Sequence, residues 1–248
     1  VRVEHPRELI DAIQFHGKDF HSAEYRLTTQ VSGRGVYSFC MCPGGFVVPS
    51  ATGCDEIVIN GMSASARNSK WSNAAIVVEI RPEDIPEKFI KKSGACPALA
   101  GLYWRAHIER EAKLHGKGQA APAQRMKDFL SHRKSESLPP TSFTPGGVSS
   151  RLDEWLPPHI ETRLEKAFAD FNKTMRGFIS HDALLIAVET RTSTPVRILR
   201  SKETGECTSI ERLYPAGEGS GYSGGIVSSA MDGENAAALI AKRFAARQ

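Results

Sequence analysis

Apolar runs alternate with polar turns along much of the chain, and the runs predict strands. Short segments rich in β-branched and aromatic residues, bounded by glycine, proline or asparagine, are typical of strands. Such segments lie at residues 36–41, 45–50, 56–60, 73–80, 183–189 and 196–199. The opening residues VRVEHP also have the pattern of a strand that runs into a helix.

Elsewhere, apolar residues recur at intervals of three and four, which predicts helices. The strongest such pattern starts at Pro157 and Pro158 and continues to Met175, and proline suits the first turn of a helix. The other helical patterns follow Pro6, occupy residues 97–132 with a second short helix at 122–132, and close the chain at 225–246. Residues 133–150 have the composition of a loop.

Composition and charge exclude several classes of protein. The 248 residues are 40% apolar and 24% charged, as in ordinary globular proteins. No apolar run approaches the length of a membrane span, so we expect no membrane association. The net charge is +4, but Lys and Arg are scattered among acids without a basic stripe or aromatic platform. We therefore expect no nucleic-acid partner.

The five cysteines lack the spacing of a disulfide framework, which favours a reducing, cytoplasmic location. Cys40 and Cys42 form a CxC pair, but a structural zinc site needs a second pair of ligands at comparable spacing. The sequence contains no such pair, and its histidines show no paired spacing, so no metal site is expected. In a strand, residues 40 and 42 share one face, so simple packing explains these thiols as well as redox chemistry does.

A glycine-rich stretch near the C-terminus is the most specific signal in the chain. It reads LYPAGEGSGYSGGIVSSAMDGENAA over residues 213–237 and connects an apolar run to a helical pattern. Gly219, Gly221 and Gly224 match the G-x-G-x-x-G dinucleotide fingerprint by letter. Glu218 argues against that use, because its charge would repel a bound pyrophosphate.

A flavin suits this stretch better than a pyrophosphate does. The hydroxyl groups of its ribityl chain can donate to the Glu218 carboxylate. Its N1/C2=O edge gains negative charge on reduction, which a helix N-terminus favours. The alternative is a glycine-rich tight turn before a terminal helix, and the letters alone favour neither.

The segment from Leu213 to Gly219 resembles the second flavin-contacting motif of glutathione-reductase-type FAD proteins, a strand that ends in Gly-Asp or Gly-Glu. From residue 1 to about 240, the chain is similar to the C-terminal portion of a family of FAD-dependent dehydrogenases. Five blocks carry the likeness in order: VYSFCMCPGGFVV (36–48), INGMSASARNS (59–69), APAQRMKDFL (121–130), ETRTSTPVRILR (189–200) and LYPAGEGSGYSGGIVSSAMDG (213–233). Since Val1 falls inside a strand pattern, we expect a fragment without the N-terminal third, where the family has its ADP-binding G-x-G-x-x-G.

The resemblance implies an α/β fold (mixed α+β) with a substrate or cap lobe at residues 33–190 and part of a split Rossmann-like FAD-binding domain. Residues 1–32 and 191–248 would belong to that domain. The implied cofactor is FAD, and the implied function is an oxidoreductase (dehydrogenase) acting with an unidentified small-molecule substrate or electron donor. The alternative is a non-catalytic binding module without cofactor, which a strongly salt-dependent affinity for nucleic acid would indicate. The sequence predicts no particular oligomeric state.

Two sets of residues are predicted to serve this chemistry. The cofactor-binding set comprises Gly44, Gly45, Gly217, Glu218, Gly219, Gly221, Gly224, Gly225 and Ile226. The catalytic set comprises Cys42, Arg191 and Arg197. Arginine at a strand end can hold a carboxylate or phosphate through two parallel hydrogen bonds. A surface ion pair of either arginine with Glu189 is the plainer alternative.

Overall fold

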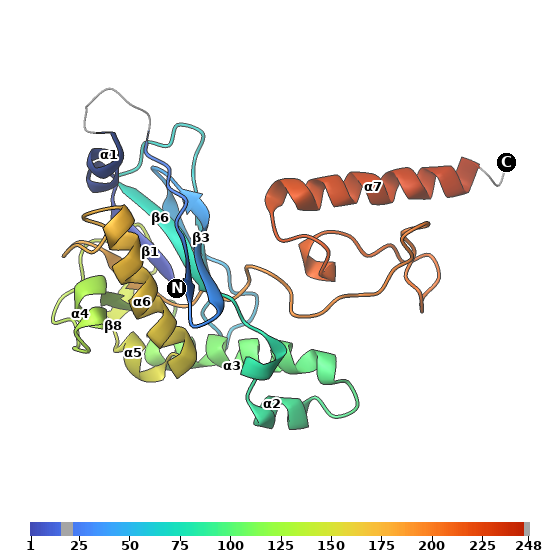
Figure 1. The fold of residues 1–248 in the computed structure, drawn as a ribbon, viewed down its shortest axis with the longest axis horizontal. Coiled ribbons are helices and arrows are strands. Elements are labelled where there is room, and N and C mark those ends of the chain that lie inside the picture. Colours follow the sequence, from blue (N-terminus) through green and yellow to red (C-terminus); the bar gives the residue numbers. More distant parts are fainter. Residues whose placement is uncertain (16–21, 246–248) are drawn as a thin grey trace. The chain divides into compact units, whose positions relative to one another are not determined.

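The computed structural model describes residues 1–15 and 22–245, which fold into two compact units (Figure 1). Unit 1 comprises Val1–Arg81 and Ala106–Thr190. Unit 2 comprises Pro82–Arg105 and the described residues from Arg191 onward. Because the chain leaves unit 1 after Arg81 and returns to it at Ala106, unit 2 is built from two separate segments.

Unit 1 is built on a seven-stranded sheet in the order β2-β3-β6-β1-β9-β7-β8. Its strands are β1 (Arg2–Pro6), β2 (Thr28–Val31), β3 (Arg34–Cys42), β6 (Trp71–Val78), β7 (Ala121–Arg125), β8 (Gly147–Ser149) and β9 (Leu184–Ile186). Neighbouring strands are antiparallel except β7 and β8, which run parallel. A separate hairpin pairs β4 (Phe46–Pro49) with β5 (Ile59–Met62). The fold is therefore mixed α/β with a mostly antiparallel sheet.

Helix α6 (Pro158–Thr174) packs on β2, β3 and β6 of this sheet. It begins at the predicted proline pair and buries Leu164, Phe168 and Phe171, so the predicted apolar stripe is confirmed as core. Phe178 lies edge-on to Phe171 with ring centroids 6.1 Å apart, which extends the aromatic core beyond the helix. Unit 1 also contains α1 (Arg7–Phe15), α4 (Met126–Leu130), α5 (Leu152–Trp155) and the C-terminal part of α3 (Ala100–His115).

The central strand β1 buries polar side chains, which are stable in a core only when they have hydrogen-bond partners. Glu4 accepts hydrogen bonds from the hydroxyl and the backbone N–H of Ser142. The Nε2 atom of His5 lies 2.8 Å from Phe178 O. The sequence assigns residues 1–32 to an FAD-binding domain, whereas β1 and β2 lie in the sheet of unit 1. Which unit holds the cofactor stays a prediction.

Two predictions of local structure near β7 need correction. The helix predicted at 122–132 is wrong in its first half, because Ala121–Arg125 form β7 and only Met126–Leu130 form α4. Strand β7 pairs with β9 on one side and β8 on the other, and these tertiary hydrogen bonds outweigh local helical spacing. The predicted loop 133–150 accordingly contains β8.

Unit 2 has little regular structure apart from helices. These are η1 (Pro82–Asp84), α2 (Glu87–Lys92), η2 (Pro97–Leu99), the start of α3, η3 (Glu218–Ser220) and α7 (Ile226–Ala245). The strand predicted at 196–199 is wrong, since this segment has only an isolated bridge nearby, between Arg200 and Cys207. Its backbone instead bonds to the glycine-rich stretch, as when Ile198 N–H donates to Ser220 O at 3.1 Å. The predicted terminal helix is confirmed as α7.

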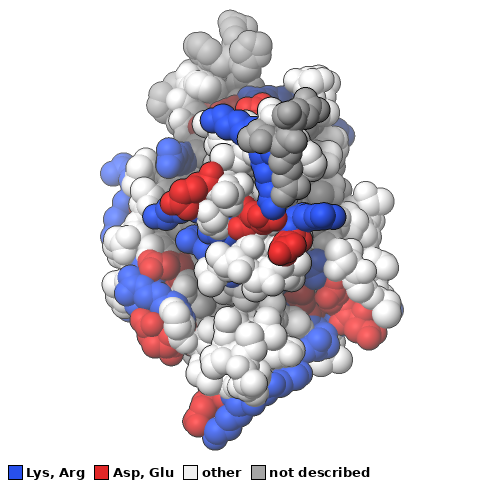
Figure 2. Space-filling view, turned by 90° about the vertical axis from the view of Figure 1, so that its right-hand side faces the viewer, with Lys and Arg blue, Asp and Glu red and all other residues white. Residues whose placement is uncertain are grey.

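The surface shows two further properties. In residues 1–15 and 22–245, every helix is too short or too polar to cross a membrane. On the face drawn in Figure 2, Lys and Arg side chains are interspersed with Asp, Glu and uncharged residues. This face therefore carries charges of both signs and not a continuous basic surface.

Candidate functional site

In unit 2, an ion pair fastens the glycine-rich stretch to helix α7. The Nη2 and Nη1 atoms of Arg200 donate to Asp232 Oδ1 and Oδ2 at 2.6 and 3.0 Å. Asp232 Oδ2 also accepts a 2.8 Å hydrogen bond from Gly217 N–H. The bonds from Arg200 and Gly217 lower the pKa of Asp232, so this carboxyl group is ionised at neutral pH. Because a two-pronged, charge-assisted pair fixes orientation as well as distance, the start of the stretch is held against α7.

Tyr222, in the middle of the stretch, contacts the segment that follows the bend at residues 190–195, which ends in Pro195 (the proline bend). The guanidinium carbon of Arg200 lies 3.7 Å from the Tyr222 ring centroid, and that of Arg197 lies 5.0 Å from it. The backbone N–H of Arg200 donates to the Tyr222 hydroxyl at 3.1 Å. Cation–π attraction adds to this hydrogen bond. The proline bend and the glycine-rich stretch therefore form one local structure.

The glycines of this stretch divide into packed and open positions. Gly221 has a φ of +84°, and a Cβ atom there would lie 2.2 Å from Val196 O, so backbone packing requires glycine. At Gly219, by contrast, no described atom lies within 4 Å of an added Cβ. At Gly224 the nearest described atom is Thr192 O, at 3.9 Å. Local packing does not explain the missing side chains at these two open positions, and the space beside them can admit a ligand.

Of the open glycines, Gly224 lies two residues before the N-terminus of α7 and Gly219 lies seven residues before it. Gly225 N–H donates to Ser228 Oγ at 3.1 Å, and Ser229 N–H donates to Gly225 O at 2.9 Å. Ile226, the first residue of α7, is 84% exposed. A helix of 20 residues presents unpaired N–H groups and partial positive charge at this end. The arrangement can bind an electron-rich edge of a ligand.

Glu218 lies in η3 between Gly217 and Gly219, and it is half-buried. Burial raises the pKa of its carboxyl group above the ordinary value, and the positive charge of Arg105 opposes that shift. Its backbone oxygen accepts a 2.8 Å hydrogen bond from Gly221 N–H, which closes a tight turn around it. When ionised, the side chain is an acceptor for the hydroxyl groups of a ligand.

The structure brings the predicted residues of unit 2 together only in part. Arg197 Nε donates to Gly221 O at 2.9 Å, so Arg197 contacts the glycine-rich stretch. Arg191 is half-buried and precedes Thr192, whose carbonyl oxygen lies beside Gly224. Sequence reasoning missed Arg200 and Asp232, although both lie inside the quoted blocks. Their spacing of 32 residues gives no local signal that they pair.

In unit 1, Cys42, Gly44 and Gly45 lie together where β3 leads into β4. An added Cβ at Gly44 would lie 1.8 Å from Arg67 O, and one at Gly45 would lie 2.5 Å from Met62 O. Close packing against the chain's own backbone therefore accounts for both glycines. Their approach to a cofactor stays a prediction.

The thiol of Cys42 is buried beside Arg2. Its Sγ lies 3.8 Å from Arg2 Nη1 and donates to Cys40 O at 3.3 Å. Burial raises the pKa of this thiol by more than the charge of Arg2 lowers it. The protonated form is therefore favoured, whereas nucleophilic and redox reactions use the thiolate. A catalytic role for Cys42 stays a prediction.

Arg2 is the centre of a buried polar cluster that the sequence does not predict. Its Nε and Nη2 atoms donate to the two carboxylate oxygens of Glu189 at 2.5 and 2.8 Å. Its Nη1 atom donates to Asn73 Oδ1 at 2.6 Å and to Cys40 O at 3.2 Å. Glu189 is thus the buried partner of Arg2, an arrangement that differs from the surface ion pair considered above. The two residues are 187 positions apart, so no spacing rule identifies them.

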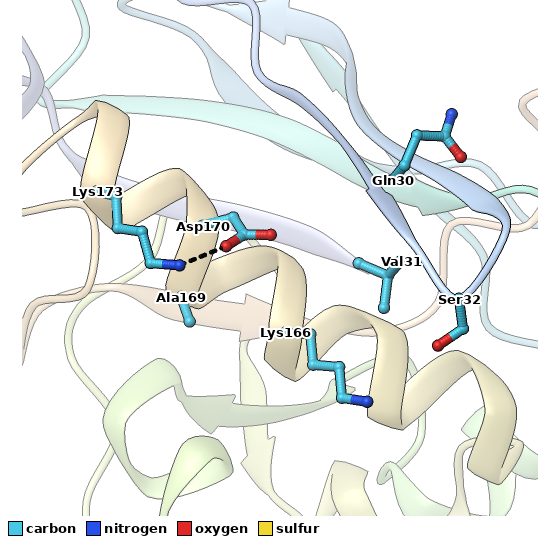
Figure 3. A pocket seen from close by; sticks show the side chains of 7 residues that line it. All are labelled: Gln30, Val31, Ser32, Lys166, Ala169, Asp170 and Lys173. Atoms are coloured by element: carbon cyan, nitrogen blue, oxygen red, sulfur yellow. Dashed lines mark hydrogen bonds and ion pairs between the residues drawn. The ribbon is translucent and has the colours of Figure 1, made fainter.

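A shallow groove of about 430 Å³ lies between α6 and the β2–β3 hairpin (Figure 3). Its lining residues are Gln30, Val31, Ser32, Lys166, Ala169, Asp170 and Lys173. Asp170 pairs with Lys173 at 2.8 Å and accepts a 3.0 Å hydrogen bond from Thr29. The lining contains no aromatic residue and none of the predicted site residues, so the groove is a poor match for a flavin ring.

Comparison with known proteins connects this geometry to a family. The family described as FAD-dependent protein, C-terminal domain-like, matches residues 1–192, which include all of unit 1. A protein of Clostridium beijerinckii, named an uncharacterized protein, is 42% identical over 254 residues. That alignment covers 98% of this chain and 46% of the relative, so the chain spans about half the length of the curated relative. The family match ends before the glycine-rich stretch, whereas the alignment with the relative covers nearly the whole chain.

Proposed function

Because the chain belongs to the family of FAD-dependent proteins that share this C-terminal domain, we propose that it is the C-terminal part of an FAD-dependent oxidoreductase. FAD, when bound, supplies hydride and electron transfer. The reaction partner is an unidentified small-molecule substrate or electron donor. Since the chain spans 46% of its curated relative, the proposal concerns the activity of the longer protein.

The observation that carries the proposal is the pair of open glycines before α7. Gly219 and Gly224 leave room for a ligand, and the N–H groups at the start of α7 favour its electron-rich edge. Glu218 would accept hydrogen bonds from ribityl hydroxyl groups at the same place. Arg197, with its exposed guanidinium beside Gly221, would hold an anionic group of the substrate, and Arg191 would assist it.

In this proposal, unit 2 belongs to a Rossmann-like FAD-binding domain and unit 1 is the substrate lobe. Helix α7 supports the assignment because it exposes the apolar side chains Ile226, Val227, Met231 and Phe244. Exposed apolar surface on this scale is typical of an element that packs against a further part of a protein.

The first test is made on the longer relative. We expect the purified Clostridium beijerinckii protein to be yellow and to carry about one FAD per chain, which absorption and extraction of the flavin measure. A colourless relative that takes up no FAD on titration would contradict the proposal.

The second test locates the flavin with alanine variants of two glycines of this chain, made within the longer protein. Gly219→Ala adds a methyl group where the described structure is empty, so it should leave folding intact. If a flavin approaches there, the variant should bind FAD about tenfold more weakly in a fluorescence titration, or ~1.4 kcal/mol. Gly233→Ala is the matched control, because it adds a methyl group to equally open space on α7. Equal FAD affinities for both variants would place the flavin elsewhere.

A further inference from the structure

Three potential metal ligands converge in unit 1, away from the glycine-rich stretch. His132 follows α4, and Glu161 and Glu165 lie one turn apart on α6. One nitrogen or oxygen atom from each residue lies within 4.8 Å of the other two. The imidazole Nε2 atom of His132 is 3.1 Å from Glu165 Oε1.

The two glutamates place like charges together in a partly buried position. Glu161 is only 9% exposed, and Thr162 donates to its Oε2 at 3.0 Å. Glu165 Oε1 is buried, and His132 Nε2 approaches it to 3.1 Å. Two carboxylates this close in a partly buried position repel each other, and a cation between them would offset that repulsion.

The histidine is oriented as metal-binding histidines usually are. Its Nδ1 atom lies 3.5 Å from Oδ2 of Asp153, whose side chain is 1% exposed. Hydrogen bonds from Arg151 and Gln124 hold the Asp153 carboxylate in place. This carboxylate is the acidic group nearest to Nδ1 that the cluster offers as a partner for the ring. A carboxylate on one ring nitrogen fixes the tautomer that leaves the other nitrogen, here Nε2, as a ligand.

Solvent can reach this cluster, because the His132 side chain is 59% exposed. Its backbone has a φ of +49°, a left-handed conformation that is uncommon for residues other than glycine, and its ring contacts Glu165 of α6. One imidazole nitrogen and two carboxylate oxygens suit zinc or manganese better than they suit magnesium or calcium, which prefer oxygen alone.

We propose that His132, Glu161 and Glu165 bind a divalent transition-metal ion, with Asp153 as the residue that orients His132. Ligands of a four-coordinate ion lie about 3.4 Å apart when each is about 2.1 Å from the metal. The His132–Glu165 pair is already near this spacing, and rotation of the long glutamate side chains brings in the third ligand. The ion would join the loop after α4 to α6. This proposal does not rest on the proposed function, since it uses residues of unit 1 alone.

Calorimetric titration of the metal-free chain with Mn²⁺ tests the proposal, and Zn²⁺ forms a second arm. Manganese is the first probe because it has little affinity for the five cysteine thiols, which also bind zinc. We expect one Mn²⁺ per chain, and thermal melts should show that the ion raises the Tm. His132→Asn and Glu165→Gln should each weaken binding at least about tenfold, and Asp153→Asn should weaken it by about tenfold through loss of orientation.

The controls separate this site from nonspecific binding and from misfolding. His181→Asn removes an exposed histidine of unit 1 and should leave the affinity unchanged. In the absence of metal, Glu165→Gln should melt no lower than the unmodified chain, because it relieves the repulsion from Glu161. Absence of Mn²⁺ and Zn²⁺ binding, or equal binding by the ligand variants, would overturn the proposal.

Discussion

Asp232 on α7 accepts hydrogen bonds from both terminal nitrogens of Arg200 and, through Oδ2, from the backbone N–H of Gly217. Arg200 in turn donates to Pro215 O at 2.6 Å and stacks on the Tyr222 ring. The Asp232–Arg200 pair therefore contacts the glycine-rich stretch at Pro215, Gly217 and Tyr222. The conformation of the proposed flavin site would therefore depend on this pair of side chains.

Replacement of Asp232 by Asn should loosen the stretch while the rest of the chain stays folded. Asparagine keeps the shape but loses the charge, and a hydrogen bond to a charged group contributes about 1.5–3 kcal/mol. We expect faster hydrogen exchange at the Gly217 amide and weaker FAD binding. Glu234→Gln, on an exposed position of the same helix, is the control and should change neither. Unaltered exchange at Gly217 in the Asp232 variant would show that the pair does not hold the stretch.

Glu218→Gln should weaken FAD binding without removing an acid–base step. Glutamine keeps one acceptor but loses the charge, so we expect about a tenfold loss of affinity, or ~1.4 kcal/mol. FAD titration of both forms of the longer protein measures this loss. Because burial raises the pKa of Glu218, the affinity of the unmodified protein should also fall as pH decreases through that raised pKa and the acceptor is lost.

Turnover at saturating FAD distinguishes this role from proton transfer. With Glu218→Gln, the rate of the FAD-saturated protein should keep its pH profile, because the carboxylate only binds the cofactor. An unchanged FAD affinity together with a lost limb of the profile would instead make Glu218 a general acid or base.

Local sequence patterns predicted those elements whose local preference agrees with their tertiary surroundings. The stripe after Pro158 and the pattern up to residue 245 both became helices, α6 and α7, and the apolar runs gave β3 and β6. Strand β7 was missed because its conformation depends on β8 and β9, which come later in the chain. The segment 196–199 has the local pattern of a strand but does not form one. Its backbone bonds to the glycine-rich stretch and not to a neighbouring strand.

The candidate sites follow the same division. Six glycines in a short stretch can be read from the letters, and so can the helix that follows. The letters do not reveal that Gly221 is needed for packing while Gly219 is open, because that difference depends on Val196, which lies in another segment. The letters also do not reveal that Glu161 and Glu165 lie beside His132. Strand β8 and helix α5 separate these glutamates from His132 along the chain.

His5 should make the chain less stable as pH falls from about 6.5 to about 4. Burial lowers the pKa of His5 to about 4, while the hydrogen bond with Phe178 O opposes the shift. The unfolded chain therefore binds a proton at His5 below its ordinary pKa, whereas the folded chain does not until about pH 4. The free energy of unfolding should decrease across this window, by up to about 3 kcal/mol from this residue.

Urea denaturation at several pH values measures the effect of His5. His5→Gln removes the titration but keeps a donor for Phe178 O, so its unfolding free energy should vary less between pH 6.5 and 4. Glu4 acts in the opposite direction, because burial raises its pKa and the folded state takes up its proton first. Glu4 is present in both proteins, so its contribution cancels when their unfolding free energies are subtracted at each pH. If the unfolding free energies of the two proteins changed with pH in the same way, His5 would have its ordinary pKa in the folded chain.

Breaking the Arg2–Glu189 pair should cost far more than breaking an exposed pair in the same unit. Arg2 is fully buried and Glu189 nearly so, so Glu189→Gln leaves a guanidinium in the core with only part of its partner. Removal of one member of a buried pair costs about 3–5 kcal/mol. Glu24→Gln is the matched control, because it removes the carboxylate of an exposed pair with Arg67 and should change the unfolding free energy little.

A double-mutant cycle separates the ion pair from the packing around it. If the stranded charge causes the loss, Arg2→Met combined with Glu189→Leu should cost less than the two single changes added together, since no unpaired charge remains. Asn73 and Cys40 O would still lose the hydrogen bonds that Arg2 donates, so the double variant should stay below the unmodified chain in stability. Additive losses would mean that Arg2 acts through those other contacts and that the pairing with Glu189 contributes little to the fold.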